Sequence, residues 1–152
     1  MKLAEALNLR ADLQKYVEQL KSRLVDNVKV QEGDKPMEQP TVLFTELNNI
    51  LPQLEDLIVK INLTNTQAVV DGKSMTQLLA EKDILRKKLD IYRAAYSHAV
   101  IRNDRYSRNE VKFVSAIDGE SLQKKIDTMS KQYRELDMKI QQANWSTELK
   151  EQ

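Results

Sequence analysis

Residues 41–62, TVLFTELNNILPQLEDLIVKIN, contain the clearest apolar pattern of the chain and decide its fold class. Leucine and isoleucine recur there at alternating spacings of four and three residues, at Leu43, Leu47, Ile50, Leu54, Leu57 and Ile61. These spacings place the side chains along one seam of a helix that packs lengthwise on other helices. Phe44, Leu51 and Ile58 form a second apolar row beside this seam. A stripe of this width predicts a helix that contacts at least two neighbours.

The composition supports a helical protein of ordinary domain size. The chain has 152 residues, of which 41% are hydrophobic and 31% are charged, with only three Gly and three Pro. Scarce turn formers and abundant charges favour long helices over a β-sandwich. Because 24 Lys and Arg residues balance 23 Asp and Glu residues, the formal charge is only +1. A basic field over the whole surface is absent, so we do not expect a nucleic-acid partner.

Three further segments have the apolar periodicity of amphipathic helices. Ser74 and Gln77 have the spacing of a capping box at the start of one segment, and Asp118 is a favourable N-cap before another. Pro52 falls within residues 41–62, but the apolar rows continue in phase on both sides, so we expect one bent helix. The polar residues after Trp145 are expected to fray. The predicted helices span residues 3–26, 41–62, 74–103 and 120–144.

Four helices of matched length with single connections predict an all-α, up-down-up-down four-helix bundle with long, coiled-coil-like helices. Polar and apolar residues alternate in the first and third connections, which predicts short strands at Val28–Gln31 and Val111–Ile117. In this topology the two connections share one end of the bundle, so we predict that they pair into a small β-ribbon. The whole chain, 1–152, is expected to form a single domain. Its heptad-type seams also predict a homo-oligomer.

The sequence contains no constellation of residues typical of an enzyme. Cysteine is absent and His98 is the single histidine, without a Glu three residues before it, so thiolate, His-rich and di-metal carboxylate sites are excluded. Nucleophile–base pairs and glycine-rich phosphate loops are also absent. We therefore predict a protein that is not an enzyme and needs no cofactor or metal. Because the chain shows neither a signal peptide nor an apolar window of about 18 residues, we expect no membrane span and a cytoplasmic location.

Two polar regions are candidate binding sites. Arg10 falls within an apolar row of the first helix: either its aliphatic stem packs while the guanidinium reaches solvent, or a buried guanidinium helps to position a ligand. Asn62 and Asn65 follow the second apolar helix, where they either cap its last carbonyl groups or form a polar pocket.

The second region is the arginine-rich segment that follows the third predicted helix, with Arg102, Asp104, Arg105 and Arg108 as its candidate residues. Guanidinium groups suit phosphate and carboxylate ligands because they donate paired hydrogen bonds. The structural alternative is a corner in which the arginines bind nearby carboxylates and backbone groups. We keep both interpretations, and a nucleic-acid surface is the least favoured of the three.

Several short stretches resemble an uncharacterised bacterial family of small helical proteins: Leu9–Gln14, Val30–Gly33, Ile61–Asn65, Asp104–Arg108 and Asn144-Trp145. The resemblance spans nearly the whole chain and implies a shared helical fold and a bacterial source. Some members carry the label septicolysin, which implies a toxin. The resemblance brings no catalytic residues to this sequence.

Three functions are compatible with these observations. The even charge and the heptad seams favour a self-associating structural or protein-interaction module. The alternative is a protein that binds a small anion or phosphate ligand through the Arg and Asn residues at one end of the bundle. A membrane-active, septicolysin-like toxin is the most distant possibility, because the sequence has no export signal and no cysteine for thiol-dependent lysis.

Overall fold

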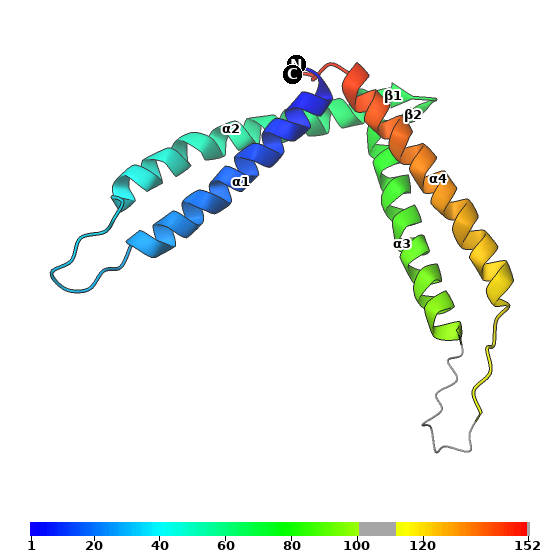
Figure 1. Cartoon of the computed structure of the whole chain (residues 1–152). Helices are drawn as coiled ribbons and strands as arrows, with labels where there is room; N and C mark the ends of the chain where they lie inside the picture. The colour runs from blue at the N-terminus through cyan, green and yellow to red at the C-terminus, as the bar shows by residue number, and fades with distance from the viewer. Residues whose placement is uncertain (101–111, 152) are drawn as a thin grey trace. The chain divides into compact units, whose positions relative to one another are not determined.

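A computed structural model describes residues 1–100 and 112–151 (Figure 1). It contains four long helices, α1 (Leu3–Asn27), α2 (Pro40–Gln67), α3 (Met75–Ala99) and α4 (Gly119–Ser146). The prediction of an all-α protein with four helices is therefore confirmed. The third helix ends at Ala99, earlier than expected, and the second runs through Pro52 to Gln67, beyond the predicted end at Asn62.

The contacts divide the chain into two compact units. The first unit comprises Met1–Ser74 and Gln142–Gln152, and the second comprises Met75–Gln141. Each contains an antiparallel helix pair with its own apolar core. The expectation of one domain over residues 1–152 stays a prediction.

In the first unit, α1 and α2 pack along their lengths (Figure 1). Two clusters of buried side chains hold them together: Leu3, Ala6, Leu57 and Ile61 at one end, and Leu20, Leu24 and Leu43 toward the other. These residues belong to the apolar rows seen in the sequence, because side chains three and four residues apart share one face of a helix. Between the clusters, Tyr16 donates a hydrogen bond of 2.8 Å to the Oε2 atom of Glu46.

In the second unit, α3 packs against α4. Leu89, Ile126 and Met129 are buried, and half-buried Leu and Tyr side chains from both helices surround them. α4 begins where the sequence predicts, because Oδ1 of Asp118 accepts hydrogen bonds from the backbone N–H groups of Glu120 and Ser121, at 3.1 and 3.4 Å.

The β-ribbon lies in a different connection from the one predicted. β1 (Val69–Val70) pairs antiparallel with β2 (Lys73–Ser74), in the short link between α2 and α3. Asp71 and Gly72 form the turn with φ angles of 50° and 80°. Asp-Gly is among the preferred pairs for a two-residue hairpin turn that needs positive φ at both positions.

The predicted strand at Val28–Gln31 is wrong, because these residues form an irregular loop. Residues 112–117 of the other predicted strand are also irregular, and Val111 lies outside the described residues. The first loop is anchored by side chains instead: the Asn27 amide bonds the carbonyl of Arg23 at 2.7 Å and the N–H of Glu38 at 3.0 Å. The two bonds tie the end of α1 to the end of this loop.

The C-terminal residues do not fray as expected. Their backbone bonds the N-terminus, with Leu3 N–H donating to the Thr147 carbonyl at 2.9 Å and Leu149 N–H donating to the Met1 carbonyl at 2.8 Å. The two chain ends consequently lie side by side in the first unit (Figure 1).

Candidate functional site

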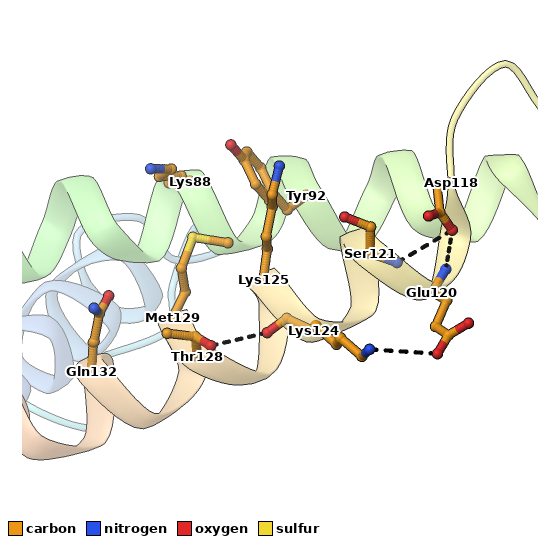
Figure 2. A pocket seen from close by; sticks show the side chains of 10 residues that line it. All are labelled: Lys88, Tyr92, Asp118, Glu120, Ser121, Lys124, Lys125, Thr128, Met129 and Gln132. Carbon is orange, nitrogen blue, oxygen red and sulfur yellow. Dashed lines mark hydrogen bonds and ion pairs between the residues drawn. The ribbon is translucent and has the colours of Figure 1, made fainter.

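One groove of the second unit lies along α3 and the N-terminal half of α4 (Figure 2). It has a volume of about 710 Å³. Most of its lining is polar, with Lys88 and Tyr92 from α3, Asp118 just before α4, and Glu120, Ser121, Lys124, Lys125, Thr128, Met129 and Gln132 from α4. Three lysines beside hydroxyl and amide groups have the chemistry to contact an anion.

The charges in this groove are partly neutralised by its own residues. Lys124 lies 3.5 Å from a carboxylate oxygen of Glu120, one helical turn earlier (Figure 2). Asp118 already accepts the amide hydrogen bonds at the start of α4, where an external phosphate would otherwise bind. Lys125 makes no ion pair with any residue in the described part of the chain. The groove is therefore of mixed charge, and Lys125 is a cation in it without a described carboxylate partner.

Arg10 lies on α1, and Asn62 and Asn65 lie near the end of α2. Arg10 lies seven residues, or two helical turns, along α1 from Leu3, which packs on Ile61 near the end of α2. Two turns correspond to about 10 Å. Asn62 is exposed and Asn65 is half-buried at that end of α2. A binding role for each of these three residues stays a prediction.

The Arg10 side chain combines features of both interpretations. The residue as a whole is half-buried, but its Nε atom is buried and has no hydrogen-bond partner among the described residues. The other candidates, Arg102, Asp104, Arg105 and Arg108, lie outside the described residues.

One exposed surface was visible in the sequence as the second apolar row of α2. Phe44 and Leu51 are 47% and 41% exposed, and Ile58 is half-buried. Leu43, Leu57 and Ile61 of the first row face α1 and are buried. We call the surface formed by Phe44, Leu51, Glu55 and Ile58 the α2 face. Glu55 is included because it lies four residues after Leu51 and three before Ile58, on the same side of the helix. α1 packs on the buried row of α2, whereas Phe44 and Leu51 of the α2 face remain exposed.

A similar surface lies on α3. Ile84 and Ile91 are seven residues apart and are 64% and 66% exposed. Lys88 lies between them along the helix, four residues after Ile84. We call these three residues the α3 face. The core residues of α3, such as Leu89, lie on a different side of the helix, since they pack against α4. The seven-residue spacing of Ile84 and Ile91 is visible in the sequence, but their exposure is not.

The described residues contain no group of three or more His, Asp and Glu side chains positioned to bind a metal. Within the same residues, no helix has the length and apolar character needed to cross a membrane. The absence of catalytic activity and the cytoplasmic location stay predictions.

Comparisons with known proteins give two matches. Residues 10–149 match the sequence profile described as Family of unknown function (DUF6847). The structure is similar to the crystal structure of a functionally unknown conserved protein from Corynebacterium diphtheriae, with 40% sequence identity, 99% of each chain covered and a TM-score of 0.92. The curated proteins give no match. These findings support an uncharacterised bacterial family, and neither description carries the label septicolysin.

Proposed function

Because the chain belongs to the Family of unknown function (DUF6847), we propose from its own surfaces that it is a self-associating structural or protein-interaction module. Its two helix pairs each bury one apolar side and leave another apolar row exposed. The observation that carries this proposal is the exposure of Ile84 and Ile91, about two-thirds each, on one side of a regular helix.

Isolated apolar side chains are common on protein surfaces, but a heptad row is typical of helix pairing. Completing the burial of an isoleucine that is two-thirds exposed contributes about 1–2 kcal/mol. Association costs at least about 4 kcal/mol in lost translational and rotational freedom. Two isoleucines on one helix are therefore too few, and a stable contact needs further apolar residues, such as Phe44 and Leu51 of the α2 face.

Sedimentation velocity over a range of protein concentrations tests this proposal. We expect the wild-type chain to associate at micromolar concentrations and the double variant Ile84→Asp/Ile91→Asp to remain monomeric. Met138→Asp is the matched control, because Met138 is 70% exposed on α4 of the same unit and belongs to neither face. Circular dichroism verifies that each variant keeps its helices. A wild-type chain that stays monomeric at several hundred micromolar would refute the proposal.

Binding of a small anion is a second candidate function, favoured by the unpaired Lys125 beside Lys88 and Lys124 in the groove of the second unit. Titration with inorganic phosphate, followed by NMR chemical shifts, tests this candidate. We expect shifts at the backbone amides of residues 121–128 that Lys125→Gln abolishes and Lys131→Gln, on an exposed part of α4, does not. Equal shifts in both variants would indicate only general screening of charge.

A further inference from the structure

We infer that the α2 face of one molecule binds the α3 face of a second copy, so that the contact joins two different surfaces. The inference rests on the proposed self-association and specifies which surfaces meet. It is carried by the matched spacing of the two faces and by the opposite charges at their centres.

The two faces have the same arrangement of residue types. Leu51, Glu55 and Ile58 on α2 have the spacing of Ile84, Lys88 and Ile91 on α3: apolar, charged four residues later, and apolar three residues after that. In each case the charged residue lies between two apolar residues on one side of the helix. Paired helices can therefore bring the apolar residues together and place the carboxylate close to the ammonium group.

Pairing of like faces is disfavoured by the same residues. Two α2 faces around a twofold axis would bring one Glu55 near the other, and two α3 faces would do the same with Lys88. Like charges next to a desolvated apolar contact are unfavourable, whereas opposite charges stabilise it and set the choice of partner.

Both charged groups are available for such a contact. Glu55 forms no ion pair with any residue that the structure describes. The Nζ of Lys88 lies 5.6 Å from the ring centre of Tyr92 and likewise pairs with no described carboxylate. The neighbouring Asp56, in contrast, is already bound to Lys60 at 2.7 Å.

The net charges of the two units favour the same pairing. Residues 1–74 and 142–152 contain ten Lys and Arg against thirteen Asp and Glu, a formal charge of −3. Residues 75–141 contain fourteen against ten, a formal charge of +4. Although the whole chain is nearly neutral, an acidic unit of one copy attracts the basic unit of another, and this attraction weakens as salt is added.

A charge exchange between two variants tests the inference. In Glu55→Lys both faces carry lysine, and in Lys88→Glu both carry glutamate, so we expect each variant alone to associate at least tenfold more weakly than wild type. In an equimolar mixture, the lysine of one α2 face meets the glutamate of the other molecule's α3 face, and the remaining Glu55 meets the remaining Lys88. We therefore expect the mixture to recover association, measured by sedimentation velocity with one variant fluorescently labelled.

The control pair is Asp12→Lys and Arg134→Glu, which changes charge by the same amounts at exposed positions on α1 and α4. Neither control variant should weaken association, and mixing them should change nothing. If the charge variants remain dissociated when mixed, the inference is overturned. A second outcome is that Ile84→Asp/Ile91→Asp abolishes association while neither charge variant weakens it. That result would mean that two like faces pair, so the proposed self-association would stand and this inference would fail. If wild type never associates, the proposed function itself fails.

Discussion

The Nζ of Lys82 on α3 lies 2.5 Å from Oδ1 of Asp137 on α4, and this ion pair joins the two helices of the second unit. Lys82 falls in phase with the apolar stripe of its helix, a position at which an unpaired ammonium group would be costly to bury. Its side chain is only 22% exposed, and its Nζ also lies 5.7 Å from the ring centre of Tyr133. The carboxylate from the facing helix therefore explains how the stripe accommodates a lysine.

This ion pair makes the stability of the second unit depend on pH. The hydrogen bond from Lys82 lowers the pKa of Asp137 from its ordinary value of 3.8. The folded state thus favours the charged carboxylate, so its stabilising effect is complete above pH 3.8 and is lost as the pH falls through the lowered pKa. We expect Asp137→Asn to reduce the free energy of unfolding by about 0.5–1 kcal/mol at pH 7, since the pair is partly solvent-exposed. Urea denaturation at pH 7 and pH 2.5 measures this. The difference between wild type and variant should shrink at the lower pH; an undiminished difference would contradict the explanation.

Leu20 tests the core of the first unit. Its side chain is fully buried with Leu24 and Leu43 between α1 and α2. We expect Leu20→Ala to lower the free energy of unfolding by about 2–5 kcal/mol, because the substitution removes buried methyl groups and leaves a cavity. Val25→Ala is the control on the same helix, since Val25 is 66% exposed, and it should change stability by less than about 0.5 kcal/mol. Chemical denaturation followed by circular dichroism distinguishes the two. Equal effects would mean that the buried cluster does not hold the helices together.

The helices could be predicted because their apolar rows are long. The spacing of Leu43, Leu57 and Ile61 identifies the side of α2 that is buried, and Asp118 marks the start of α4 by its capping chemistry. The end of α2 was missed because polar residues after Asn62 suggest a loop. In the structure the hydroxyl groups of Thr64 and Thr66 donate to carbonyls four residues earlier, which satisfies these side chains within the helix.

The short ribbon and the candidate site were harder to predict. Polar and apolar residues alternate at Val28–Gln31 as they do in a strand, but a strand also needs a second strand with which to pair. Val69 and Val70 have one because Asp71-Gly72 turns the chain directly back on itself. Similarly, Glu55 and Lys88 are charged residues of helical segments in the sequence, but only the packing of each helix pair shows that the apolar residues beside them stay exposed.

Asn27 connects the end of α1 to the loop before α2. Its side chain is 8% exposed and hydrogen-bonds backbone groups of Arg23 and Glu38. We expect Asn27→Ala to lower the free energy of unfolding by about 1–2 kcal/mol, because the Glu38 N–H loses its acceptor. Limited proteolysis should also cleave residues 28–37 faster. The exposed Gln31→Ala variant in the same loop should show neither effect, and matching cleavage rates in the two variants would count against an anchoring role.

Thr64 holds the C-terminal residues against α2. It is fully buried, and its Oγ1 donates to the Lys60 carbonyl at 2.7 Å while accepting from the Lys150 N–H at 2.9 Å. Thr64→Val keeps the shape of the side chain but removes both bonds, so we expect a loss of about 1 kcal/mol in the free energy of unfolding. Hydrogen exchange at the Lys150 amide, measured by NMR, should become faster by roughly tenfold or less for a bond of that strength. Thr66→Val is the matched control, because Thr66 makes the same bond to a carbonyl four residues earlier but is exposed. If Lys150 exchanges equally fast in both variants, Thr64 does not anchor the C-terminal residues, and their attachment depends on their other contacts, such as the backbone bonds to Met1 and Leu3 and the packing of Leu149.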